Sequence, residues 1–174
     1  LVTGAGGGLG AAIAKRLAEE GARVLCTDLG DRAEAVAEAI VTAGGVASAM
    51  TADVTRPEDC EAQVAETVGR YGAIDVLINN AGVALHRLAL DTSLEDWERV
   101  LRINLTGSFM TAQAAARVMV EQGGGRIVQL GSISGQRGNM GGLAYGASKA
   151  AVMHLCKVFS VELASAGVMV NAIA

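Results

Sequence analysis

Two residues suited to proton transfer, Tyr145 and Lys149, lie four positions apart. On a helix, residues at i and i+4 are neighbours, so the two side chains can meet. A tyrosine hydroxyl has a pKa near 10 in water, so acid/base work at neutral pH requires a nearby positive charge, which a lysine ammonium in a partly dry site supplies. Taken alone, the pair is also compatible with ordinary packing on an amphipathic helix.

A serine hydroxyl lies where a substrate could meet this pair. Ser132 follows the apolar run 126–130, which is typical of a strand. Open α/β sheets place their ligands at the carboxyl ends of the strands. A hydroxyl there could donate to a substrate carbonyl oxygen and stabilise the charge that develops on it. Ser134, two residues later, competes for the same role.

The segment from Thr3 to Gly10 is rich in glycine and directly follows the apolar run 1–3. It opens a predicted helix over about 9–20. Glycine allows a pyrophosphate to approach the backbone closely, and a helix N-terminus offers unpaired N–H groups. The placement therefore predicts a dinucleotide-binding loop, with a flexible glycine turn as the alternative.

Asp28 ends the next predicted strand, about 20 positions after the loop, where a carboxylate can accept hydrogen bonds from the adenosine ribose hydroxyls. The same carboxylate would repel a 2'-phosphate. We therefore expect NAD as the cofactor. NADP is the less favoured alternative because Arg32 is close enough in sequence to offset the repulsion. Asp28 could also merely cap the following turn.

Strand and helix patterns alternate along the whole chain. Strands are predicted at 1–3, 23–27, 45–50, 74–78, 126–130 and 168–173, and helices at about 9–20, 31–43, 57–71, 95–121 and 145–166. This order predicts an α/β fold with a doubly wound parallel sheet, that is, a three-layer α/β/α Rossmann fold. No linker, repeat or low-complexity tract divides the chain, so residues 1–174 are expected to form a single domain.

Composition limits the possible partners. The chain is 51% hydrophobic and 18% charged, with a net charge of -4 and no basic runs. This argues against nucleic acid or an anionic membrane surface as a partner and favours a small molecule. The three cysteines match no metal-ligand spacing, so no metal site is expected, and they indicate a reducing cytoplasm. No apolar run approaches the roughly 20 residues needed to span a bilayer.

Together these motifs resemble the short-chain dehydrogenase/reductase family in its compact, single-domain form, over the whole chain. The family's Thr-Gly-x-x-x-Gly-x-Gly loop is matched from Thr3 to Gly10, and its Asn-Asn-Ala-Gly motif from Asn79 to Gly82. The resemblance implies that Asp53 and Val54 contact the adenine ring. The full implied set of cofactor-binding residues is Gly4, Gly8, Leu9, Gly10, Asp28, Asp53, Val54, Asn80, Ala81, Gly82, Tyr145 and Lys149.

The resemblance also implies a catalytic set of Asn104, Ser132, Tyr145 and Lys149. Family spacing, with the serine 13 residues before the tyrosine, selects Ser132 over Ser134. Tyr145 would exchange the proton with the substrate oxygen, Ser132 would orient that oxygen, Lys149 would hold the nicotinamide ribose and Asn104 would anchor a water relay. The expected reaction is hydride transfer between NAD and a secondary alcohol or ketone, with the hydride carried by the cofactor.

Two other functions are also compatible with the sequence. The same fold can serve as a catalytically silent NAD sensor or scaffold, and sugar-nucleotide epimerases or dehydratases share the Tyr-x-x-x-Lys pair. Those epimerases typically space their loop glycines as Gly-x-x-Gly-x-x-Gly, which the loop here fits less well. The substrate could be a polyol, a hydroxy-steroid or a 3-hydroxyacyl thioester. The segments 84–90 and 133–143 are expected to border its pocket.

The chain begins and stops inside predicted strands, so we expect a fragment of a longer protein, truncated at both ends. In the family a turn, a substrate loop and a final strand follow the last strand seen here. Family members are usually dimers or tetramers joined through two long helices, here 95–121 and 145–166. We therefore expect a homotetramer or homodimer, although burial within one subunit would also explain the small and apolar residues of these helices.

Overall fold

A computed structural model describes residues 1–174. Six strands alternate with six α-helices along the chain. The strands are β1 (Val2–Thr3), β2 (Arg23–Asp28), β3 (Val46–Thr51), β4 (Val76–Asn79), β5 (Gly125–Leu130) and β6 (Val168–Ile173). The helices are α1 (Gly8–Glu19), α2 (Arg32–Thr42), α3 (Pro57–Tyr71), α4 (Leu94–Leu101), α5 (Ser108–Glu121) and α6 (Leu143–Leu163).

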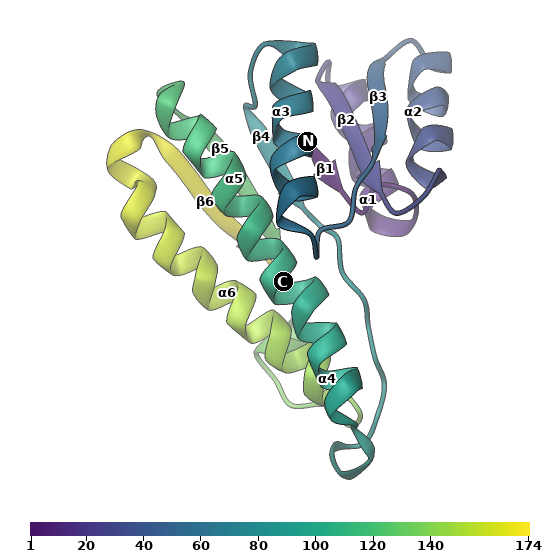
Figure 1. Cartoon of the computed structure of the whole chain (residues 1–174), viewed down its shortest axis with the longest axis vertical. Helices are drawn as coiled ribbons and strands as arrows, with labels where there is room; N and C mark the ends of the chain where they lie inside the picture. The colour runs from purple at the N-terminus through teal and green to yellow at the C-terminus, as the bar shows by residue number, and fades with distance from the viewer.

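All six strands are parallel and form one sheet in the order β3-β2-β1-β4-β5-β6. Figure 1 shows α3, α5 and α6 covering one face, while α1 lies behind the sheet. The predicted three-layer Rossmann fold is confirmed. The chain winds outward in one direction from β1 and in the other from β4, so the two central strands form the switch point at which such sheets bind ligands.

Strand β2 illustrates why the strand sequences are almost continuously apolar. Leu25 packs into the core cluster beneath α3, α5 and α6, whereas Val24 and Cys26 pack into the cluster beneath α1 and α2. Successive side chains of a strand point to opposite faces, so burial of both faces demands apolar residues at consecutive positions. Burial of both faces therefore accounts for the apolar residues at consecutive positions of β2.

The predicted helix over 95–121 is wrong as one continuous α-helix. It consists of α4, a π-helical segment at Arg102–Gly107, and α5. Two residues of the π-helical segment contact other parts of the chain. Asn104 bonds to the backbone of Val83, and Gly107 packs against Val54. A π-helical turn holds one more residue than an α-helical turn, and apolar spacing over a long window does not reveal it.

Other element boundaries differ slightly from prediction. Strand β4 begins at Val76, two residues later than expected, and α6 begins at Leu143, two residues earlier. The connection after β4 runs away from the sheet before the chain returns in α4 (Figure 1). None of the helices combines the length and apolarity required to cross a lipid bilayer.

Candidate cofactor and catalytic site

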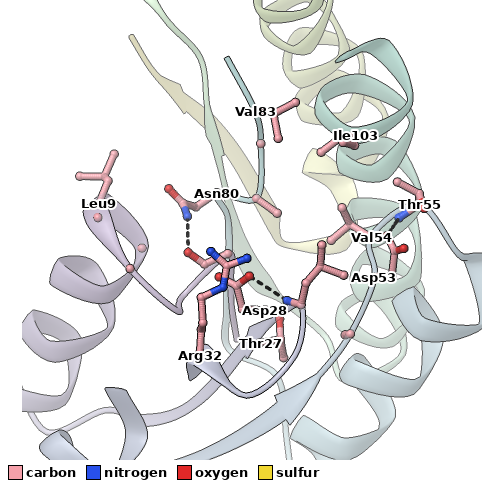
Figure 2. A pocket seen from close by; sticks show the side chains of 18 of the residues that line it. Leu9, Thr27, Asp28, Arg32, Asp53, Val54, Thr55, Asn80, Val83 and Ile103 are labelled. Atoms are coloured by element: carbon pink, nitrogen blue, oxygen red, sulfur yellow. Dashed lines mark hydrogen bonds between the residues drawn. The ribbon is translucent and has the colours of Figure 1, made fainter. Parts of the chain in front are cut away.

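A cavity of about 720 Å³ lies over the carboxyl ends of the central strands. Its wall comprises the glycine loop, the end of β2, the segment after β3, the segment after β4 and the π-helical segment, as Figure 2 shows in part. Ten of the twelve predicted cofactor residues line it: Gly4, Gly8, Leu9, Gly10, Asp28, Asp53, Val54, Asn80, Ala81 and Gly82. Tyr145 and Lys149 are not among its lining residues.

The loop glycines divide into two kinds. A Cβ on Gly10 would lie 2.1 Å from the carbonyl oxygen of Gly4, so this position packs α1 against the loop and admits no side chain. Gly8 has φ +51° and, like Gly7, faces open space within the cavity wall. The backbone of α1's first turn is therefore exposed to the cavity, as an approaching phosphate requires.

Asn80 ties the glycine loop to the end of β4. Its Nδ2 donates to the carbonyl oxygens of Thr3 at 2.9 Å and Gly4 at 3.1 Å. In return, the backbone N–H groups of Asn80 and Ala81 donate to Thr3 Oγ1, each at 3.0 Å. Both amide hydrogens of the Asn80 side chain are thus used to hold the glycine loop, so Asn80 shapes the cavity by fixing that part of its wall.

Asp28 faces the cavity with both carboxylate oxygens already accepting backbone hydrogen bonds. Its Oδ2 accepts from Gly6 N at 2.8 Å and its Oδ1 from Leu29 N at 2.7 Å. Arg32 also lines the cavity, and its side chain lies beside Asp28 in Figure 2. A cationic side chain therefore lies near Asp28, as the sequence allowed, although the two form no ion pair.

Lys149 is nearly buried, and its ammonium is anchored on β5. Nζ donates to the carbonyl oxygen of Leu130 at 2.6 Å and lies 5.8 Å from the ring centroid of Tyr145. No carboxylate forms an ion pair with it. Desolvation by burial lowers the pKa of Lys149. The predicted meeting of the two side chains on one face of α6 is therefore present in the fold.

Asn104 is fully buried, and its amide joins two segments near the pair. Its Oδ1 accepts from Val83 N at 2.8 Å, while Nδ2 donates to Val83 O at 2.9 Å and to Ser148 Oγ at 3.1 Å. Ser148 Oγ in turn donates to Tyr145 O at 2.7 Å. Both amide hydrogens are therefore used within the protein, and Asn104 fixes the helix turn that carries Tyr145.

Ser132 follows β5 directly. Its Oγ accepts from Ser134 N at 3.1 Å, which leaves the hydroxyl hydrogen of Ser132 available as a donor. Because Lys149 binds Leu130, two residues earlier, the serine and the lysine share one strand end. Hydrogen bonds thus link Asn104 through Ser148 to the backbone of Tyr145, and Lys149 is bonded to Leu130, two residues before Ser132. No hydrogen bond joins Ser132 to the other three residues of the predicted catalytic set.

Several residues of the site escaped prediction. Arg99, Arg102 and Ile103 line the cavity from α4 and the π-helical segment. Their spacing of three and four positions places them on one helical face, but a charged exposed face normally indicates solvent contact. Ser148 lies inside the recognised Tyr-x-x-x-Lys motif, yet only its contact with Asn104 identifies its part in the arrangement.

The segments expected to border a substrate pocket do meet. Arg87 N donates to Gly141 O at 3.0 Å, and the ring of His86 lies against Gly141, whose φ is +74°. A second cavity, of about 590 Å³, adjoins this junction and the first turns of α6. Leu88, Met140 and Arg137 give its wall both apolar and cationic character.

A family model described as short chain dehydrogenase matches residues 1–174. A 3-oxoacyl-[acyl-carrier-protein] reductase of Synechocystis is 40% identical over 176 residues, covering 100% of this chain and 71% of that protein. The reductase FabG of Aquifex aeolicus is 42% identical, with the same coverage.

Solved structures agree with these sequence matches. A NAD+-bound xylitol dehydrogenase superposes with a TM-score of 0.96 and 39% identity, covering 99% of this chain and 67% of the other. A short-chain type dehydrogenase/reductase of Mycobacterium marinum gives a TM-score of 0.95 and 40% identity, covering 99% and 70%.

Proposed function

The chain belongs to the short-chain dehydrogenase/reductase family of nicotinamide-dependent oxidoreductases, and from that premise we propose that it transfers a hydride between NAD and a secondary alcohol or ketone. The observation that carries the proposal is the arrangement around Lys149. Its desolvated ammonium lies 5.8 Å from the Tyr145 ring and is anchored at the strand end that leads to Ser132. Residues 1–174 would act as one cofactor-binding and catalytic unit.

In the oxidation direction, Tyr145 accepts the proton of the substrate hydroxyl. The Lys149 ammonium lies 5.8 Å from the ring centroid of Tyr145, where its positive charge would stabilise negative charge that develops on the tyrosine during proton transfer. Ser132 donates its unused hydroxyl hydrogen to the substrate oxygen and stabilises charge there. The bound nicotinamide supplies the hydride acceptor.

Asn104 keeps this geometry by holding Ser148 and the backbone after β4. Since its amide hydrogens are engaged, a water relay anchored on Asn104 would use its backbone or the second lone pair of Oδ1. Lys149, whose Nζ keeps donors besides the one given to Leu130, is available to bind the nicotinamide ribose.

NAD is the proposed cofactor because Asp28 lies in the cavity wall, where a carboxylate repels a 2'-phosphate. The NAD+-bound state of the xylitol dehydrogenase, which has 39% identity, supports this choice. The Arg32 side chain beside Asp28 supports NADP instead, so the two dinucleotides are compared directly in the assay below.

The test is an absorbance assay of the protein that carries this chain, with NAD and NADP and two substrate groups. Polyols represent the xylitol dehydrogenase likeness, and 3-hydroxyacyl thioesters represent the 3-oxoacyl reductase likeness. Turnover of one group with NAD supports the proposal. Tight NAD binding without turnover in either direction across both groups would favour the silent sensor instead.

A further inference from the structure

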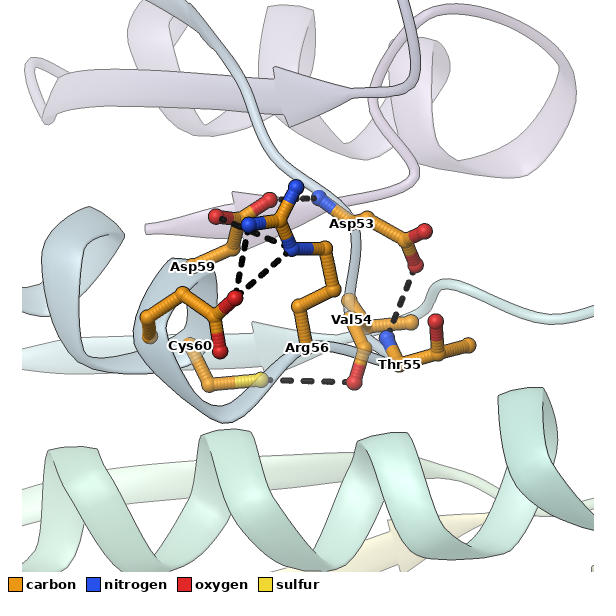
Figure 3. Close-up of polar contacts among 7 residues, drawn as sticks. Asp53, Val54, Thr55, Arg56, Asp59 and Cys60 are labelled. Carbon is orange, nitrogen blue, oxygen red and sulfur yellow. Dashed lines mark hydrogen bonds and ion pairs between the residues drawn. The ribbon is translucent and has the colours of Figure 1, made fainter.

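The segment just after β3 forms part of the cavity wall but belongs to no strand or helix, and the first turn of α3 holds it in place. Arg56 N donates to Asp53 O at 3.0 Å, and Asp59 Oδ2 accepts from Asp53 N at 2.9 Å. Cys60 Sγ donates to Val54 O at 3.3 Å (Figure 3). Both backbone groups of Asp53 and the carbonyl of Val54 are therefore fixed by one helix start.

The thiol of Cys60 is a well-defined donor. Its side chain is 1% exposed, and desolvation raises the pKa of the thiol, so it keeps its hydrogen at neutral pH. Its sulfur accepts a hydrogen bond from Thr111 Oγ1 at 3.4 Å. With that acceptor role filled by α5, the single S–H hydrogen is directed to the Val54 carbonyl.

Beyond Thr111 the hydrogen bonds continue through the core. Gln63 Nε2 donates to Thr111 Oγ1 at 3.5 Å, and Thr27 Oγ1 donates to Gln63 Oε1 at 2.8 Å. The Thr27 hydroxyl has the carbonyl oxygen of Val2 as a second, longer acceptor at 3.4 Å, and its shorter bond is to Gln63. From Gln63 the bonds run in one direction, through Thr111 and Cys60 to Val54. The two ends of this series of bonds, Thr27 and Val54, both line the cofactor cavity, and Thr27 directly precedes Asp28.

Val54 is also confined from the opposite side. A Cβ on Gly107 would lie 2.9 Å from both Val54 O and Val54 Cγ2. The Val54 carbonyl therefore lies between the π-helical segment and the thiol of Cys60. Loss of the thiol contact would free the carbonyl on one side only, and the wall would shift away from Gly107.

We propose that Cys60 is a positioning residue for the dinucleotide: its thiol fixes Val54, and with it the wall that receives the adenine half of the cofactor. The proposal rests on dinucleotide binding as proposed above. It assigns no chemistry to the thiol, which is enclosed by protein.

The test compares Cys60→Ala with Cys60→Ser, using calorimetric titration with NAD, AMP and NMN. Loss of one buried hydrogen bond predicts an affinity for NAD and for AMP that is about 3- to 10-fold weaker in Cys60→Ala. NMN affinity is expected to stay unchanged. Cys60→Ser retains a donor and is expected to remain within about two-fold of the wild type. In turnover assays, KM for NAD rises while kcat stays constant.

The matched control is Cys156→Ala, which removes an equally small buried thiol that makes no hydrogen bond. It is expected to leave AMP affinity unchanged. Asp59, which is more exposed than Cys60, provides a second pair of variants. Asp59→Asn keeps an oxygen acceptor for Asp53 N and is expected to preserve AMP affinity, whereas Asp59→Ala lowers it.

Unchanged AMP affinity in Cys60→Ala, beside a wild type that binds AMP, overturns the positioning role alone. An equal loss of NMN affinity also overturns it, because that pattern indicates general destabilisation. A wild type that binds no dinucleotide overturns the proposed function and this inference with it.

Discussion

The ammonium of Lys149 donates to the carbonyl oxygen of Leu130 at 2.6 Å, so a helix residue of the proposed site is attached directly to the end of β5. This bond sets the distance between α6 and the strand that leads to Ser132. It also explains how an unpaired ammonium tolerates burial, because a backbone carbonyl replaces part of its lost hydration.

Replacing Tyr145 by phenylalanine removes the proposed proton-transfer group with little change in shape. We expect kcat to fall by about 10²- to 10⁴-fold, the usual contribution of general acid/base catalysis. NAD affinity, measured by calorimetry, should remain within a few-fold of the wild type because Tyr145 is absent from the cavity wall. Unchanged turnover would contradict the mechanism. Tyr71→Phe, on α3 and away from α6, serves as the control.

The lowered pKa of Lys149 is expected to make the free energy of unfolding depend on pH. Below both pKa values the lysine is charged in the folded and unfolded chains, and the folded state bears the desolvation cost. Once pH passes the lowered folded pKa, the unfolded chain, whose lysine pKa is near 10.5, binds more protons. The free energy of unfolding should therefore gain a rising component with pH up to about 10.5.

The measurement is denaturant unfolding of the wild type and Lys149→Met across the alkaline range. Subtraction of the two curves removes the titration of other groups. A flat difference would show that burial does not perturb this lysine. The substitution itself is expected to abolish turnover.

Asp28→Ala tests cofactor choice. Loss of the carboxylate removes the repulsion toward a 2'-phosphate and leaves the Arg32 guanidinium to attract it, so the ratio of NADP to NAD affinity should rise by about ten-fold or more. Binding titrations with both dinucleotides measure that ratio. Asp31→Ala, in the same loop but outside the cavity lining, should leave it unchanged. Wild-type preference for NADP would contradict the role given to Asp28.

Replacing each of the two fully buried glutamines, Gln129 and Gln63, by methionine is expected to change the free energy of unfolding in opposite directions. Neither polar atom of the Gln129 side chain has a hydrogen-bond partner, whereas Gln63 bonds to Thr27 and Thr111. Gln129→Met should raise the free energy of unfolding by about 1–3 kcal/mol, the cost of an unpaired buried polar group. Gln63→Met should lower it. Thermal melting of the two variants tests the contrast, and equal effects would contradict it.

Apolar side chains on α5 and α6 predict association of subunits. Phe109 packs edge to face on Phe159, and Val161 remains 81% exposed in the single chain. If these helices meet a second copy, Val161→Glu should place a charge in the interface and shift the protein toward monomer. Light scattering coupled to gel filtration measures the mass. A wild-type monomer would remove the proposed homo-oligomer.

The sequence predicted the sheet well because buried parallel strands leave an unmistakable signature. Val24–Cys26 and most of Val168–Ile173 are apolar runs between helical patterns, and the strands β2 and β6 begin and end within one residue of the predicted bounds. The glycine loop and Asp28 could be singled out from the sequence because each comes at the end of a predicted strand, where a dinucleotide-binding residue is expected. Tyr145 and Lys149 were paired by helical spacing alone.

What escaped prediction depends on contacts between distant segments. Asn104 was identified through the resemblance, yet nothing local indicates that its amide reaches Val83 and Ser148. Nothing in the sequence singles out Cys60 within the predicted helix over 57–71, because its contact with Val54 depends on the packing of α3 against α5. Residue type and spacing indicate chemistry, but long-range hydrogen bonds decide which atoms are already engaged.

The π-helical segment at Arg102–Gly107 has a consequence for how this chain could vary. An α-helix advances about 100° per residue. The one additional residue in the π-helical segment therefore rotates the side chains of α4 about the helix axis relative to those of α5. A single-codon deletion here would rejoin the two as one regular helix and rotate Arg99 by roughly a quarter turn away from the cavity. Asn104 and Gly107 could then not both keep their partners. A deletion in this stretch would therefore cost either the hydrogen bonds of Asn104 to the Val83 backbone or the packing of Gly107 against Val54.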